Sequence, residues 1–215
     1  MSWQVMLSSM GEGMLRTLAI FFLTILFSMP LGMVVTLLRR SKFKIISGIT
    51  KVYIAIMRGT PLMLQLLAWY FGPYYLFGTT VARNKLIPVV IAFSINYAAY
   101  FAEIFRGGIQ SIPKGQYEAA YMLGMTRTQT FFRIILPQVV KRVVPASANE
   151  VITLVKDTSL AQVIAVTELF ALAKKQQAAY ASIYPLFVAG VFYYVANLLL
   201  SVLFAYVERK LNYYK

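Results

Sequence analysis

The residues of this chain with the clearest chemical potential are carboxylates set within long apolar stretches. Glu103 and Asp157 are the two best candidates. A charged side chain at the centre of a bilayer costs from about 3 to more than 10 kcal/mol, so it must face a cavity, water or a partner group. We therefore expect both carboxylates to face a polar pathway, where they would attract a positively charged ligand.

Glu103 shares its predicted helical face with two other polar side chains. Asn96 and Tyr100 precede it by seven and three residues, which places an amide, a phenol and a carboxylate on one stripe. The alternative is a structural ion pair of Glu103 with Arg106 or Arg58. Both interpretations remain open from the sequence.

A second set of carboxylates follows later in the chain. Glu150, Asp157 and Glu168 are spaced so that, at about 100° per residue, they lie within roughly 20° of one line along a helix. Such a ladder would line a path. Alternatively, Asp157 is neutralised by Lys156 or caps a break in the helix, and Glu150 and Glu168 are solvated helix ends.

Composition identifies the class of protein that holds these residues. Hydrophobic residues make up 60% of the chain and charged residues 13%, whereas a soluble domain carries about 25% charged residues. The chain has neither cysteine nor histidine, which removes thiolate metal sites, thiol nucleophiles and the usual general base. We therefore predict a polytopic membrane protein that is not an enzyme and has no catalytic or metal-binding residues.

The hydrophobic pattern predicts an all-α fold of one domain, residues 1–215, because about 20 apolar residues cross the hydrocarbon core as a helix. Met1 to Gly13 is expected to be a weakly amphipathic segment, without a signal-peptide layout. Pro30 and Pro61 are expected to kink the first and second spans. The five predicted spans are Met14 to Leu38, Tyr53 to Phe77, Leu86 to Gly108, Ser147 to Leu172 and Ile183 to Val207.

Basic residues predict the orientation of these spans. Of the 21 lysines and arginines, 14 lie between the first two spans, from Arg106 at the end of the third span to the start of the fourth, and near the C-terminus, up to Lys215. The positive-inside rule places these regions in the cytoplasm and the N-terminus outside. The net charge of +14 lies at membrane flanks, so nucleic acid is not an expected partner.

A polar loop between the third and fourth spans, approximately residues 110–140, carries the most distinctive motif. Its central part, residues 116–124, predicts a short exposed helix that ends at Gly124, followed by a stop at Pro137. Glu118 is expected near the positive end of the helix dipole, and Ala119 and Ala120 are expected to leave a small surface for a partner. An ordinary amphipathic cytoplasmic helix is the alternative.

This loop resembles the EAA loop of ABC-importer permeases, and other stretches resemble the polar amino acid branch of that family. They begin at Arg58-Gly59-Thr60-Pro61, at Asn96, at Ile112 and at Asn149, and the five-span layout matches over essentially the whole length. The resemblance implies a type I-like importer permease of the prokaryotic inner membrane. Its coupling helix, with Glu118, Ala119, Ala120 and Gly124, would dock into a separate ATPase that binds ATP and Mg, so no cofactor is expected in this chain.

The resemblance also implies the other partners. These are a second permease copy or a paralogue, an extracytoplasmic binding protein and a polar amino acid as the substrate. Glu103 and Asp157 favour a cationic substrate such as arginine, lysine or histidine, and a neutral amide such as glutamine is the alternative. The polar groups expected to bind the α-amino and α-carboxylate groups are Asn96, Tyr100, Gln65, Thr158 and Ser159.

Two other classes of protein compete with this interpretation. An ion-coupled secondary carrier would also place carboxylates in broken helices, but such carriers usually contain repeats, and none is visible here. An intramembrane enzyme would need a base beside Ser94, Ser159 or Lys156, and the chain has no histidine. The chain also lacks a Gly-x-x-x-x-Gly-Lys-[Ser/Thr] loop for nucleotide phosphates.

Overall fold

A computed structural model describes residues 3–79 and 82–211 of the 215, and every regular element in these ranges is helical, which confirms the all-α class. Met1 and Lys215 lie outside the described residues. The elements are α1 (Trp3–Arg39), α2 (Lys44–Gly59), α3 (Leu62–Phe77), α4 (Leu86–Gln110), α5 (Lys114–Met122), α6 (Arg127–Gln129), the π-helix η1 (Thr130–Ile135), α7 (Leu136–Asp157), the 3₁₀-helix η2 (Thr158–Ile164), α8 (Leu169–Tyr180) and α9 (Tyr184–Leu211).

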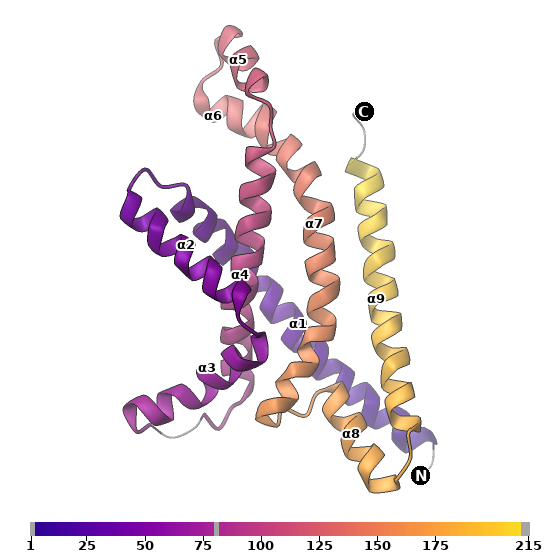
Figure 1. Ribbon diagram of the computed structural model, residues 1–215. Helices are drawn as coiled ribbons and strands as arrows, with labels where there is room; N and C mark the ends of the chain where they lie inside the picture. The colour runs from indigo at the N-terminus through magenta and orange to yellow at the C-terminus, as the bar shows by residue number, and fades with distance from the viewer. Residues whose placement is uncertain (1–2, 80–81, 212–215) are drawn as a thin grey trace.

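The helices form an elongated bundle (Figure 1). α7 packs between α4 and α9, α1 crosses the bundle, and the short helices α5 and α6 lie at the end opposite to α3 and α8. One apolar core joins α1, α3, α4, α7 and η2, with Phe93, Phe101 and Leu154 fully buried in it. This core fixes the face that α4 turns toward α7.

The spans agree only partly with the boundaries predicted from the sequence. Among the described helices, α1, α4 and α9 are long and apolar enough to cross a membrane, and α2 with α3 makes a fourth span if the bent pair is one. The predicted fourth span, Ser147 to Leu172, is wrong as a continuous helix. α7 begins earlier, at Leu136, and the chain then passes through η2 before α8 begins at Leu169.

The second predicted span is also broken. The chain bends by 109° between α2 and α3. Thr60 and Pro61, which lie at the bend, both have extended backbone dihedrals. Proline cannot donate the backbone hydrogen bond that a continuous helix would need at this position. The kink expected at Pro61 is therefore a complete break, whereas α1 continues through Pro30.

Close contacts hold α1 against its neighbours. The described part of the predicted amphipathic segment, Met1 to Gly13, is continuous with the first span, because α1 is one helix from Trp3. A Cβ atom at Gly13 would lie 2.8 Å from the Cα of Leu169, and one at Gly32 would lie 2.7 Å from the Cβ of Phe101. Small residues thus let the helices approach closely, as is common between membrane helices.

Candidate functional site

The short helix α5 presents an exposed apolar tip at one end of the molecule (Figure 1). Tyr121, Met122 and Leu123 at its end are 80%, 83% and 79% exposed. Gly124 follows with a φ of +71°, a left-handed conformation that glycine adopts without strain. The helix and its glycine break were thus predicted correctly, whereas the three exposed apolar residues were missed. Their signal in the sequence is an uninterrupted apolar run at the end of a polar helix.

Two expectations about the residues of α5 are wrong. Ala120 is 3% exposed, and its carbonyl accepts a hydrogen bond from the backbone N–H of Met125, so its side chain faces the protein. α5 begins at Lys114 with no acidic residue in its first turn, which places Glu118 in the second turn, away from the positive end of the dipole. Glu118 and Ala119 are exposed and remain available to a partner.

Pro137 does not stop the helix, contrary to the sequence prediction. It lies in the first turn of α7, directly after the π-helix η1, where the N–H of Leu136 donates to the carbonyl of Phe131. The first turn of a helix tolerates the missing N–H of proline, and π-helical turns absorb local irregularities of this kind. The chain therefore passes from η1 into α7 without a loop.

Polar contacts connect α5 to α7. The side-chain amide of Gln138 donates to the side-chain oxygen of Gln116 at 3.1 Å and to the carbonyl of Ile134 at 2.8 Å. Arg142 donates to the carbonyl of Ser111, directly after α4. These hydrogen bonds link α5 and the end of α4 to α7, the helix that carries Glu150 and Asp157.

Asp157 lies at the end of α7 and faces α4. Its Oδ2 accepts a hydrogen bond of 2.8 Å from the phenol of Tyr97, and its side chain is only partly buried. Tyr97 was not among the predicted site residues, although its position three residues before Tyr100 places it on the same helical face. This pair brings together two helices that are far apart in the sequence.

Glu103 is neutralised within its own helix. The Nε of Arg106 donates to one carboxylate oxygen at 2.9 Å, and an NH2 group of the same guanidinium donates to the other. Tyr100 lies one helical turn before Glu103. The guanidinium carbon of Arg58, on α2, is 5.2 Å from the centre of the Tyr100 ring, within the range of a cation–π contact. The structural ion pair considered for Glu103 is therefore present.

Asn96 and Gln65 form a hydrogen-bond network at the break between α2 and α3. The amide of Asn96 donates to the carbonyl of Met57 at 2.8 Å and to the side-chain oxygen of Gln65 at 2.9 Å. Gln65 in turn donates to the carbonyl of Met57 and to the hydroxyl of Thr60. Both side chains are buried, and they satisfy backbone groups that the broken helix leaves unpaired.

Thr158 and Ser159 lie where α7 passes into η2. Their hydroxyls donate to the carbonyls of Val155 and Lys156, each at 2.7 Å, and Thr158 is fully buried. These bonds satisfy the carbonyls at the end of α7. The break expected after Asp157 is thus present, and the two hydroxyls stabilise it.

Glu168 departs from both interpretations given to it. It is fully buried rather than solvated, and η2 interrupts the helix that would have aligned it with Glu150. Its carboxylate accepts hydrogen bonds from the backbone N–H groups of Phe170 and Ala171 and from the phenol of Tyr193, at 2.7 to 3.0 Å. It therefore caps α8 and ties it to α9.

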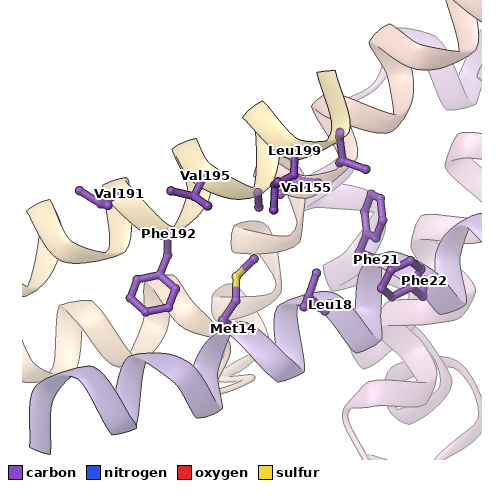
Figure 2. A pocket seen from close by; sticks show the side chains of 11 residues that line it. Met14, Leu18, Phe21, Phe22, Val155, Val191, Phe192, Val195 and Leu199 are labelled. Atoms are coloured by element: carbon purple, nitrogen blue, oxygen red, sulfur yellow. The ribbon is translucent and has the colours of Figure 1, made fainter. Parts of the chain in front are cut away.

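An apolar groove between α1 and α9 has a different character (Figure 2). Its volume is about 440 Å³, and aliphatic and aromatic side chains such as Met14, Phe21 and Val195 line it. No group there would bind an ammonium or a carboxylate. Asp157 and Tyr97, by contrast, meet where α7 contacts α4, and among the described residues no three His, Cys, Asp or Glu gather as a metal site.

Comparison with protein families gives one match that covers most of the chain. Residues 28–213 match the family described as the binding-protein-dependent transport system inner membrane component. The L-cystine transport system permease protein TcyB of Bacillus subtilis (strain 168) is 40% identical over 208 residues, covering 95% of this chain and 87% of that protein. The arginine transport system permease protein ArtQ of the same organism is 39% identical, with 94% and 91% covered.

A solved structure shows the same arrangement of helices. It is described as the crystal structure of an amino acid ABC transporter with histidines, and it superposes with a TM-score of 0.87 at 33% identity. The match covers 98% of this chain and 99% of the other.

Proposed function

This chain belongs to the family of binding-protein-dependent transport system inner membrane components and is a permease subunit of an amino acid ABC importer, for which we propose cationic amino acids as the substrates. In this family of importers a separate subunit hydrolyses ATP. The chain is accordingly a multi-pass protein of the inner membrane. The named relatives carry different amino acids, cystine and arginine, so the proposed substrate charge rests on the residues of this chain.

The observation that carries the proposal is that Glu150 and Asp157 on α7 have no close ion-pair partner. Among the described residues, the ion pair within 4.0 Å is that of Glu103 with Arg106, and Glu150 and Asp157 have only the longer-range attraction of Arg58 and of Lys156, respectively. Both side chains are partly accessible. A cationic ligand would supply the missing counter-charge in a medium of low dielectric constant.

The contacts described above change the roles we propose for the other candidates. Asp157, held by Tyr97, would bind the cationic end of the substrate, and Tyr100 would border the same face. Asn96 and Gln65 donate to the backbone at the break between α2 and α3, and Thr158 and Ser159 donate to the carbonyls at the end of α7. We propose that they shape the path. A neutral amide such as glutamine remains the alternative substrate, since a carboxylate also binds any α-ammonium group.

For coupling, we propose that the exposed tip of α5 docks into the ATPase. Tyr121, Met122 and Leu123 offer an apolar surface with Glu118 and Ala119 beside it. Exposed apolar patches rimmed by polar residues are typical of protein contacts. ATP and Mg would be bound by the partner, and an extracytoplasmic binding protein would deliver the substrate at the opposite end.

We further propose that two permease chains enclose the path, either two copies or this chain and a paralogue. Only 6% of the apolar window of α9 is buried within one chain, which leaves surface for a second chain. The basic residues support an orientation with the tip of α5 and the C-terminus in the cytoplasm and the N-terminus outside.

The test is transport by the assembled importer. The permease, purified with its ATPase subunit and reconstituted with the binding protein, should hydrolyse ATP faster when arginine, lysine or histidine is supplied than with glutamine. Stimulation by glutamine alone would favour the alternative substrate. Uptake by the permease without ATP would instead support an ion-coupled carrier.

A further inference from the structure

A cationic pocket lies at the end of the molecule opposite to α5. Three segments that are distant in the sequence line it: α1 contributes Arg16, the stretch before α4 contributes Arg83 and Lys85, and residues 165–167 follow η2. The volume of the pocket is about 370 Å³. Its position away from α5, and from the face between α4 and α7, leaves it outside the substrate and coupling sites proposed above.

The charge of this pocket is not balanced by acidic groups. Its lining residues include no aspartate or glutamate. Glu12 lies one helical turn before Arg16 but forms no ion pair with it within 4.0 Å, among the pairs of the described residues. Glu168, next to the lining residue Thr167, is fully buried and accepts hydrogen bonds from α8. The three cations therefore favour an anion.

The cations also retain donors for such an anion. Arg16 donates from one nitrogen to the carbonyl of Thr167 at 3.1 Å and to its hydroxyl, and a guanidinium carries five N–H donors in total. Lys85 makes only a long contact of 3.4 Å with the carbonyl of Ala165. Arg83 has an exposed side chain. The contact with Thr167 orients Arg16 and leaves the rest of its guanidinium available.

Besides the cations and the polar residues Asn84 and Thr167, the lining of the pocket is apolar. Ala19, Ile20, Leu86 and Val166 line the pocket beside the cations. Lys85 directly precedes α4, whose 25 residues span about 37 Å at 1.5 Å per residue, somewhat more than the ~30 Å of the hydrocarbon core. A bilayer crossed by α4 would therefore place Lys85 near the phosphates of one leaflet, with the apolar side chains of the pocket facing glycerol and acyl carbons.

We propose that this pocket binds the phosphodiester of an anionic phospholipid between Arg16, Arg83 and Lys85. Arginine binds phosphate through charge-assisted, often bidentate hydrogen bonds, and lysine binds it as a point charge. A binding protein would contact the surface above the membrane. The pocket instead combines its cations with apolar side chains, which suits a lipid better than a soluble protein. The inference requires only that the chain spans the membrane, and it is independent of the proposed substrate and of the ATPase contact.

The experiment measures lipid affinity of the intact permease, assembled with its ATPase, by native mass spectrometry in detergent titrated with phosphatidylglycerol or phosphatidylcholine. We expect tighter binding of the first phosphatidylglycerol, and a loss of roughly fivefold in affinity for each cation removed in Arg83→Gln/Lys85→Gln. The matched control is Lys174→Gln/Lys175→Gln, which removes the same charge from exposed positions of α8 that do not line the pocket. This control should bind phosphatidylglycerol as the unaltered chain does.

Several results would overturn the proposal. The first is equal affinity of the unaltered chain for the two lipids, and the second is an unchanged affinity of Arg83→Gln/Lys85→Gln for phosphatidylglycerol. The third is an equal loss of affinity in the α8 control, which would show that only the net charge of the protein matters. Unchanged lipid binding with lost stimulation by the binding protein would assign the pocket to that protein instead. If the double variant does not assemble, Arg83→Gln alone should still lose roughly fivefold.

Discussion

The carboxylates of the apolar region differ in what surrounds them, and this difference separates structural from functional roles. Glu103 is paired with Arg106, and Glu168 caps α8. Among the described residues, Asp157 has the phenol of Tyr97 as its hydrogen-bond donor and Lys156 as a more distant positive charge. A paired carboxylate gains little from a cationic ligand, whereas an unpaired one gains its missing counter-charge. Asp157 is therefore the residue to which we assign the reading of substrate charge.

A double-mutant cycle tests the structural role of Glu103. Glu103→Gln and Arg106→Gln should each lower the thermal stability of the detergent-purified chain, and the double variant should lose less than the sum of both. The interaction free energy should be about 0.5 to 3 kcal/mol, as expected for side chains in direct contact. Additive losses, together with a selective loss of arginine transport in Glu103→Gln, would restore Glu103 to the substrate site.

The sequence indicated these carboxylates but not their partners. Spacing along one helix predicted the pairing of Glu103 with Arg106 as one of two alternatives, because three residues separate neighbours on a helical face. The contact of Tyr97 with Asp157 was missed because it depends on how α4 packs against α7. The burial of Glu168 was likewise missed, since η2 turns the chain away from the helical path that the spacing assumed.

At the scale of elements, the break between α2 and α3 depends on one buried network. Asn96→Leu would remove both donors to Met57 and Gln65 while keeping a side chain of similar size. We expect a loss of about 1 to 3 kcal/mol in the free energy of unfolding, because the buried side-chain oxygen of Gln65 would lose the donor that Asn96 supplies. The midpoint of thermal unfolding in detergent measures this loss. Full stability with a specific loss of transport would instead favour direct substrate binding by Asn96.

The turn after α5 makes a second prediction at this scale. Gly124→Leu places a side chain at a φ of +71°, which costs about 1 to 2 kcal/mol for a residue with a Cβ. We expect this strain to displace the tip of α5 and to abolish ATP-driven uptake, with insertion preserved. Gly107→Leu, at a helical position without close neighbours, is the control that should transport. Uptake by a stably expressed Gly124→Leu variant at the level of the unaltered chain would contradict the proposed coupling.

The length of the apolar runs predicted where membrane-spanning helices occur better than it predicted where these helices begin and end. The first, third and fifth spans were found because each is a continuous apolar run. The second and fourth were predicted as single helices, although polar and charged residues such as Arg58 and Asp157 interrupt them. Hydropathy reports how apolar a segment is, and it does not show that Thr60, Pro61 and the 3₁₀-helix η2 redirect the chain.

For the whole molecule, the absence of cysteine from the sequence allows a clean test of orientation. Leu123→Cys places one thiol at the exposed tip of α5, and Ile183→Cys places one at the exposed turn before α9. A membrane-impermeant maleimide added to intact cells should label Ile183→Cys and should label Leu123→Cys only after permeabilisation. Labelling of Leu123→Cys in intact cells would reverse the proposed orientation.

Assembly is tested by the stoichiometry of the purified complex. Two permease chains, identical or paralogous, should co-purify with two ATPase subunits, because we propose that two permease chains are needed to enclose the substrate path. Native mass spectrometry gives the count directly. A complex with one permease chain that supports ATP-driven uptake would contradict this arrangement.

The central claim is that the face between α4 and α7 carries the substrate and that Asp157 reads its charge. The most direct measurement is ATP-driven uptake of arginine and of glutamine into proteoliposomes by the unaltered importer and by Asp157→Asn, which keeps the shape and removes the charge. Transport efficiency for arginine should fall by about 2 kcal/mol or more, roughly thirtyfold, and that for glutamine by clearly less. An equal fall for both substrates, or no fall for either, would contradict the account.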